Sequence, residues 1–243
     1  MSLQLKIVLA IVVALIAIGI GMAAQRGVLQ GSGESSVADI FGIKNVPSLT
    51  RSVKYSSDIA PDVKQTLEKH VADLRATLKE NDTDYEAWLT LAIRYKQAGD
   101  LDKAREIWEY LASIHPDDVV PRHNLGDLYH HFLNDYTKAE MYYKQALELS
   151  PMNALDYLAL YELYRYSLKQ DTAAVDILKE GIGRVTENQP IDLYIALANF
   201  YVAKGDTSEA IANFTKARDL AQKTGNTSLV TQLNAEIAQL REP

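Results

Sequence analysis

The chain has 243 residues, of which 47% are hydrophobic, so it is long enough to bury the core of one substantial domain. Its formal net charge of −7 and its pI of about 5.3 argue against a nucleic-acid partner, and no basic patch with interleaved aromatic residues offsets that charge. The sequence contains no cysteine, which excludes disulfides, thiolate catalysis and zinc–thiolate sites.

The first element, over residues 1–25, is predicted to be a single membrane-spanning helix. Within residues 5–24 the one charged side chain is Lys6, and at a rise of about 1.5 Å per residue the apolar run is close to the hydrocarbon thickness of a bilayer. A cleaved secretory signal peptide is the alternative, but its apolar region is usually shorter. Lys6 before the helix and Arg26 after it favour an orientation with the bulk of the chain outside the cytoplasm.

Small side chains form one stripe of this predicted helix, and they are Ala10, Ala14, Ala17 and Gly21. Such a stripe lets two membrane helices approach closely, which permits self-association through the transmembrane helix. Alanine is also common filler in apolar helices, and we favour this simpler interpretation.

Residues 26–60 are predicted to form a flexible linker. Turn-forming residues gather there, including Gly31-Ser32-Gly33 and Pro47, and no helical period is sustained. A short ordered piece is expected around residues 40–43.

The chain downstream of the linker repeats itself at steps of 34 to 37 residues. The first unit is marked by Trp88, Leu91, Ala92, Tyr95, Ala104, Trp108 and Pro116. The second unit is marked by Leu125, Gly126, Tyr129, Ala139, Tyr143 and Pro151, and the fourth by Tyr194, Leu197, Ala198, Tyr201, Ala210 and Phe214. The third unit is the weakest, because Tyr161 replaces its small residue and no proline closes it.

This spacing resembles the signature of the tetratricopeptide-repeat (TPR) family, W-x2-L-G-x2-Y, then A-x3-F, then P. The resemblance implies an all-α TPR solenoid of about four helix-pair repeats plus flanking helices, within a domain over 61–243. The predicted repeats cover 85–118, 119–153, 154–190 and 191–224. A helix pair cannot bury its apolar stripe alone, so neighbouring pairs stack, and the Trp and Tyr residues of the motif are expected in the shared core.

Short turns and capping residues are expected to delimit the helices. Asp206, three residues before Glu209, predicts the start of a second helix, and Asp100 is expected to cap in the same way. Before the first unit, an apolar stripe from Val63 to Leu78 behaves like the second helix of a partial repeat. After the fourth unit, a capping helix is predicted at 226–241.

In TPR folds the first helix of each pair lines a concave surface that takes up a peptide or a helix. The resemblance therefore implies a partner-binding groove with a mixed apolar and polar wall. Its predicted lining is Leu89, Ile93, Lys96, His123, Asn124, Asp127, His130, His131, Glu162, Arg165, Tyr166 and Asn199. Further lining residues are Gln97, Leu158, Ile195 and Val202.

Some family members hold a partner's C-terminal carboxylate in a clamp of Lys, Asn and Arg, and two residues here resemble parts of it. Asn124 and Arg165 match, but Leu89 and Ile93 stand where the clamp has a basic residue and an asparagine. A desolvated carboxylate needs several donors, so an incomplete clamp is not favoured.

A metal site is a second specific alternative. His123, Asp127 and His131 recur at four-residue steps, with His130 adjacent, and imidazole with carboxylate can ligate zinc. A polar groove without metal is favoured, because no familiar zinc motif is present.

The sequence does not indicate an enzyme or a cofactor. It contains no glycine-rich phosphate loop, no G-x-S-x-G elbow and no G-x-G-x-x-G fingerprint, and nothing aligns a nucleophile with a base.

The favoured function is a membrane-tethered scaffold or adaptor for a protein or peptide partner in envelope complex assembly. The arrangement is similar to bacterial inner-membrane TPR proteins with the repeats outside the cytoplasm, including those that present apocytochrome during cytochrome c maturation. A chaperone-like holder of unfolded clients is the alternative, and an organelle import receptor shares the same N-terminal anchor.

Overall fold

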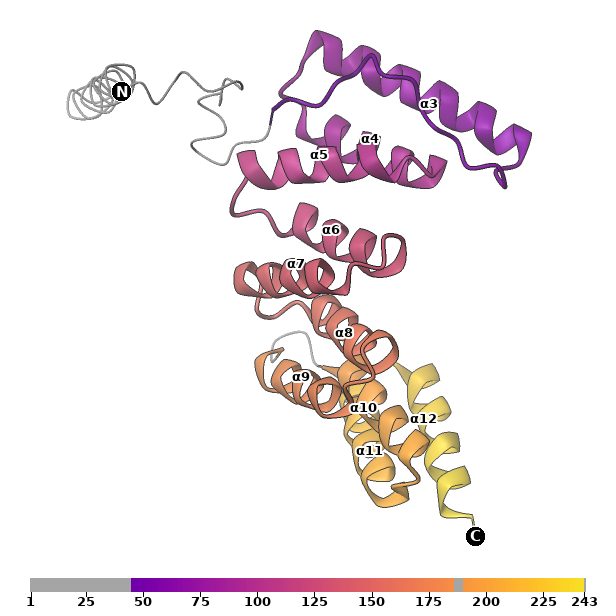
Figure 1. Cartoon of the computed structure of the whole chain (residues 1–243). Coiled ribbons are helices and arrows are strands. Elements are labelled where there is room, and N and C mark those ends of the chain that lie inside the picture. Colours follow the sequence, from indigo (N-terminus) through magenta and orange to yellow (C-terminus); the bar gives the residue numbers. More distant parts are fainter. Residues whose placement is uncertain (1–44, 186–189, 243) are drawn as a thin grey trace, which may run out of the picture. The chain divides into compact units, whose positions relative to one another are not determined.

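The computed structural model of the chain describes residues 45–185 and 190–242 (Figure 1). The predicted membrane helix at 1–25, its stripe of small residues and the first part of the linker lie outside the described residues. Among the described residues, no helix is both long enough and apolar enough to span a bilayer. Asn45–Pro243 forms one compact unit, which contains all the helices described here.

All regular structure in the described residues is helical, and the helices stack one after another (Figure 1). Helix α3 (Pro61–Glu80) comes first. The pairs that follow are α4 (Tyr85–Ala98) with α5 (Leu101–Ile114), α6 (Val119–His131) with α7 (Tyr136–Leu149), α8 (Ala154–Glu162) with α9 (Asp171–Arg184), and α10 (Ile191–Lys204) with α11 (Thr207–Lys223). One π-helical turn, η1 (Leu163–Ser167), continues α8, and α12 (Thr227–Arg241) ends the stack. The prediction of an all-α solenoid is confirmed.

The turns within the pairs explain where the first helices stop. Gly99 follows α4 with a φ of 84°, and Gly205 follows α10 with a φ of 76°, a left-handed conformation that glycine adopts without a Cβ clash. Asp206 then accepts a hydrogen bond from the backbone N–H of Glu209 at 3.1 Å. The predicted cap at the start of α11 is therefore confirmed.

Aromatic side chains of the repeat motif fill the core between the layers. Trp88, Tyr95, Trp108 and Tyr143 are each no more than 1% exposed, as their place in the motif predicts. Full burial of a large aromatic side chain stabilises the fold by roughly 2–3 kcal/mol. These residues therefore act as structural core.

Glycine at position 126 lets α6 and α7 approach closely. A Cβ built on Gly126 meets the Tyr143 ring at 2.5 Å from both Cδ1 and Cε1, well inside an ordinary carbon–carbon contact of about 3.5–4.0 Å. The small residue that the motif requires here is thus explained by one neighbouring ring.

The third pair departs from the motif, and its first helix is distorted accordingly. Tyr161 takes the place of the small residue and is 6% exposed, and the π-helical turn η1 begins two residues later. The close approach moves to the second helix, where a Cβ on Gly181 meets Tyr157 Cγ at 2.6 Å. A π-helical turn of this kind absorbs one extra residue in a helix.

Residues 45–60 belong to the predicted flexible linker, and here the structure differs. Part of this segment, residues 49–56, packs against the solenoid, and we call it the strap. The backbone N–H of Ser56 donates to the carbonyl of Ala98 at 2.8 Å. The side chains of the strap that pack against the core are Leu49 and Val53. Composition alone did not reveal this docking.

A buried ion pair holds the strap. Asp100 and Lys103 are 2% and 5% exposed, and Lys103 Nζ lies 3.2 Å from Asp100 Oδ2. Lys103 also donates to the carbonyls of Arg51 and Ser52, while Asp100 accepts the backbone N–H of Lys54 at 2.9 Å. The prediction that Asp100 caps α5 is therefore wrong, because its carboxylate binds the strap and makes no capping bond.

Candidate partner-binding face

The first helices of the pairs lie in a row, and polar contacts join neighbours across whole repeats. Lys96 of α4 contacts Asp127 of α6, and His123 of α6 contacts Asp156 of α8. Helices α8 and α10 are also in direct contact. We call the solvent-facing surface of α4, α6, α8 with η1, and α10 the A-helix face.

Lys96, Asp127 and His131 form a polar cluster on this face. Lys96 Nζ lies 2.7 Å from Asp127 Oδ2, and His131 Nε2 lies 3.7 Å from Asp127 Oδ1. The Lys96 ammonium also lies 5.3 Å from the centroid of the Phe132 ring. Because these groups are partly exposed, the ion pair contributes about 1 kcal/mol or less to stability. The cluster offers a partner a cation beside an aromatic surface.

His123 is oriented by a buried carboxylate. Its Nδ1 lies 2.7 Å from Oδ1 of Asp156, which is 0% exposed and also accepts a hydrogen bond from Asn153 Nδ2 at 2.6 Å. The hydrogen bond to Asp156 raises the pKa of His123. Since the His123 side chain remains 36% exposed, the ring edge carrying Nε2 is the part it can offer to a partner.

His130 does not line the surface, so its predicted role is wrong. It is 5% exposed, and its Nε2 lies 2.9 Å from Oγ of Ser167. Its Nδ1 is buried with no hydrogen-bond partner among the described residues. Burial lowers the pKa of His130 to about 4, so the ring is neutral at pH 7. His130 packs from α6 against α7 and η1 and is not available to a partner.

Arg165 is engaged within the chain as well. Its guanidinium pairs with Asp171, which also binds the Lys204 ammonium. Both cations lie over the Phe200 ring, at 4.6 Å for Arg165 and 5.7 Å for Lys204. The hydrogen bonds from Lys204 and Arg165 lower the pKa of Asp171. A carboxylate clamp would need this arginine unpaired, so the arrangement does not support one.

The remaining predicted lining residues divide into two groups. Leu89 and Ile93 are partly buried and pack against the hydrophobic core, and the Asn124 amide donates to the carbonyl of Val120 in its own helix at 3.0 Å. The residues that face solvent are Glu162, Tyr166 and Asn199. Tyr166 is 60% exposed, which is unusual for a large aromatic side chain in a packed domain.

The predicted alternative of a His-based metal site is not supported. Among the described residues, no three His, Cys, Asp or Glu side chains are placed to hold a metal ion. Each four-residue step turns about 40° around a helix, so His123 and His131 diverge by about 80°. His123 contacts Asp156 and Asp127 contacts Lys96, so two of the three side chains have other partners.

Sequence reasoning missed part of the apolar surface of the A-helix face. Val120, Phe132 and Leu155 are 38%, 45% and 63% exposed. Val120 precedes Asp127 by seven residues, and Leu155 precedes Glu162 by seven. Seven residues are about two helical turns, so each apolar residue shares a face with a predicted lining residue. This spacing was the signal in the sequence that would have found Val120 and Leu155.

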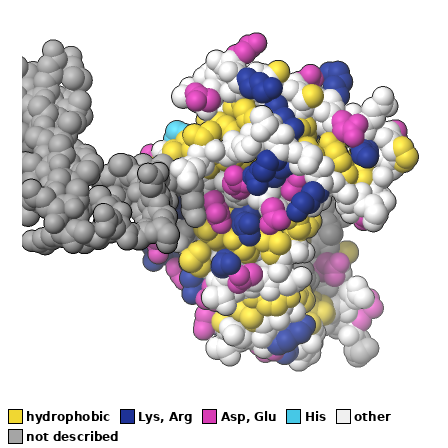
Figure 2. All heavy atoms as spheres, turned by 45° about the horizontal axis from the view of Figure 1, so that its top comes forward, with side chains coloured by type: hydrophobic (Ala, Val, Ile, Leu, Met, Phe, Trp, Pro, Cys, Tyr) yellow, Lys and Arg dark blue, Asp and Glu magenta, His cyan; other side chains and the backbone are white. Residues whose placement is uncertain are grey.

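Charged side chains of both signs are interspersed on the surface. Figure 2 brings the α3 end of the stack forward and shows hydrophobic patches between basic and acidic side chains, without a large area of one sign. This side of the molecule therefore does not select a partner by the partner's net charge.

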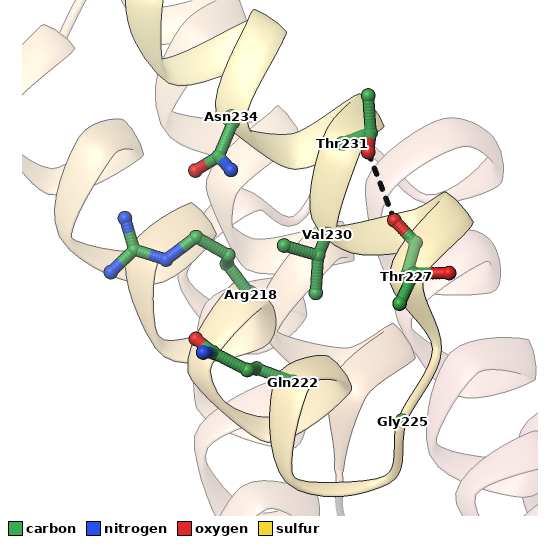
Figure 3. A pocket seen from close by; sticks show the side chains of 7 residues that line it. All are labelled: Arg218, Gln222, Gly225, Thr227, Val230, Thr231 and Asn234. Carbon is green, nitrogen blue, oxygen red and sulfur yellow. Dashed lines mark hydrogen bonds between the residues drawn. The ribbon is translucent and has the colours of Figure 1, made fainter.

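A surface pocket of about 530 Å³ lies between α11 and α12 (Figure 3). Its arginine, Arg218, already pairs with Asp219 at 2.6 Å. The hydroxyl of Thr231 donates to the carbonyl of Thr227 at 3.0 Å. Because the charge and this hydroxyl are satisfied within the chain, the pocket is not our candidate site.

Stacked helix pairs with a continuous row of first helices define an α-solenoid. The sequence model of the tetratricopeptide repeat matches residues 121–153 and 191–224. These two segments of the chain are therefore tetratricopeptide repeats. A search of curated proteins gives no match.

Solved structures with a similar fold include TPR proteins. A crystal structure of MamA is 20% identical over 69% of this chain and 98% of that chain, with a TM-score of 0.52. TTC0263, a thermophilic TPR protein in Thermus thermophilus, is 24% identical over 71% of this chain and 92% of that chain, with a TM-score of 0.49. PilW, a widely conserved type IV pilus biogenesis factor, is 22% identical over 72% of this chain and 86% of that chain, with a TM-score of 0.49. The similarity to MamA supports the fold alone.

Proposed function

We propose that the chain is a membrane-tethered TPR scaffold that binds a segment of a partner protein along the A-helix face, in the assembly of a complex of the cell envelope. The observation that carries the proposal is the set of large apolar side chains left exposed on this face. They are Val120, Phe132, Leu155, Tyr166 and Val202.

Polar contacts around these side chains favour binding. Lys96 with Asp127, His123 with Asp156, and Arg165 with Asp171 are paired within the chain, so the face is ordered before a partner arrives. An ordered face costs less conformational entropy on binding. The exposed aromatic and aliphatic groups then supply the affinity, as in other protein interfaces.

The N-terminal region supports the membrane part of the proposal. The apolar run at residues 7–24 is long enough for a spanning helix, and its flanking charges favour repeats outside the cytoplasm of a bacterial inner membrane. A tether of this kind raises the effective concentration of the A-helix face near membrane partners. Protease accessibility in intact cells and in spheroplasts tests the orientation: resistance to protease in spheroplasts would contradict it.

Site-specific photo-crosslinking in native membranes tests the proposed function. Probes replace Tyr166 on η1 and Asn199 on α10, with Lys179, an exposed residue of α9, as the matched control on a second helix. We expect one dominant protein captured from Tyr166 and Asn199 and none from Lys179. Equal capture from all three positions would contradict the proposal, and many clients captured from the A-helix face would indicate a chaperone instead.

A further inference from the structure

Helix α3 takes the position of the second helix of a repeat, and among the described residues no first helix of that repeat precedes it. It ends at Glu80, five residues before Tyr85, just as α5 ends at Ile114, five residues before Val119. The strap covers one side of α3, where the Arg75 guanidinium donates to a strap carbonyl at 2.6 Å. Among the described helices, α4 is the one with which α3 makes its main contact.

A cation takes a core position at this end of the solenoid. Arg94 of α4 aligns with Leu128, Leu163 and Phe200 of the following pairs, which are 0%, 0% and 6% exposed. A complete helix pair precedes each of those three residues, whereas α3 alone precedes Arg94. The periodic pattern is thus broken at the residue that faces the incomplete repeat.

A pocket of about 460 Å³ opens between α3 and α4 at this point, and Arg94 forms part of its wall. Val63 and Leu67 of α3 supply an apolar wall, and Val63 is 50% exposed. Arg94 Nη1 donates to the neutral amide oxygen of Gln97 at 2.8 Å. Its Nε is buried without an acceptor in the described residues. An anionic group in the pocket would lie beside this guanidinium and offset its charge.

We propose that this pocket binds an acidic side chain of the partner, an aspartate or a glutamate that stands beside an apolar residue. The carboxylate accepts hydrogen bonds from the Arg94 guanidinium, whose planar donors match it in two-pronged geometry. The apolar neighbour packs against Val63 and Leu67. Asp62 on the same wall repels a second negative charge, so one carboxylate fits better than a phosphate or an acidic run.

This inference rests on the proposed function, since it names the chemistry of the partner at one end of the row of first helices. The test uses the full-length chain in lipid nanodiscs and two fluorescent amphipathic peptides. The peptides are identical except that one carries a glutamate, and the other a glutamine, on the edge of the apolar face. We expect the glutamate peptide to bind about tenfold more tightly by fluorescence anisotropy, as expected for a charge-assisted hydrogen bond.

Variants assign that preference to the pocket. Arg94→Gln should abolish the preference for the glutamate peptide. Val63→Asp changes a half-exposed position and does not threaten the fold. This variant should weaken binding of the glutamate peptide more than binding of the glutamine peptide. Arg184→Gln, at an exposed arginine of α9, should leave the preference unchanged. Equal affinities of the two peptides for the unmodified chain would overturn the proposal, as would a preference that survives Arg94→Gln.

The peptide test decides on the pocket and the crosslinking test decides on the A-helix face, so either proposal can be rejected without the other. A glutamate preference that depends on Arg94, together with no capture at Tyr166, would keep the pocket and reject the A-helix face. Capture at Tyr166 with equal peptide affinities would reject the pocket and keep the proposed function.

Discussion

Replacing Gly126 with alanine should destabilise the solenoid, although alanine is the better helix former. In a helix interior this change alone stabilises by up to about 1 kcal/mol. At Gly126, however, the new Cβ lies 2.5 Å from two atoms of the Tyr143 ring, about 1 Å inside a normal contact. Tyr143 is 1% exposed, so its ring has no free space to move into. Overpacking of this kind costs about 1–3 kcal/mol, and subtracting the gain in helix propensity leaves a net loss of up to about 2 kcal/mol.

Gly183→Ala is the matched control, because a Cβ there has no atom within 4 Å. Gly183 lies in the last turn of α9, so this variant should gain about 0.5 kcal/mol from helix propensity. Urea unfolding followed by far-UV circular dichroism gives both free energies. If Gly126→Ala is as stable as Gly183→Ala, the close approach of α6 and α7 is not as described.

Three further predictions concern the buried polar groups and a helix cap. The pKa of His130 is lowered to about 4, so protonation of this residue favours the unfolded state as pH falls from about 6.5 towards 4. Over this range, the unfolding free energy from denaturation curves should fall by roughly 3 kcal/mol more in the unmodified chain than in a His130→Gln variant. The same pH dependence of the unfolding free energy in both proteins would contradict this. The Lys54 amide donates to Asp100 and the Ser56 amide donates to α4, so both amides should exchange hydrogen slowly. Lys103→Met should abolish this slow exchange. Unchanged exchange rates would show that the ion pair does not hold the strap. Asp206→Ala removes the cap of α11 and should cost about 1 kcal/mol of unfolding free energy, measured in urea; a loss below about 0.3 kcal/mol would refute the role of the cap.

The solenoid could be predicted because its signals repeat. Trp88, Gly126 and Asp206 each stand at a motif position whose packing or capping role depends on neighbours within one repeat. Local spacing therefore determined their roles, and the structure agrees in each case.

Contacts between repeats could not be read in the same way. Asp156, the partner of His123, lies in the next repeat, and no periodic rule specifies which carboxylate a surface histidine will meet. His130 shared the motif position of Lys96, yet Ser167 and two tyrosine rings enclose it. Asp100 matches the cap Asp206 in sequence, but the strap takes its carboxylate. Each error came from a tertiary partner distant in sequence.

The central claim is that exposed apolar side chains of the A-helix face bind the partner. The most direct measurement is the affinity of the crosslinked partner, once purified, for Tyr166→Ala and for Met141→Ala, since Met141 is similarly available (42% exposed) on the second helix α7. We predict that Tyr166→Ala weakens binding tenfold or more, because truncating an aromatic interface residue often costs about 2 kcal/mol, and that Met141→Ala has no effect. Equal affinities for both variants and the unmodified chain would contradict the account.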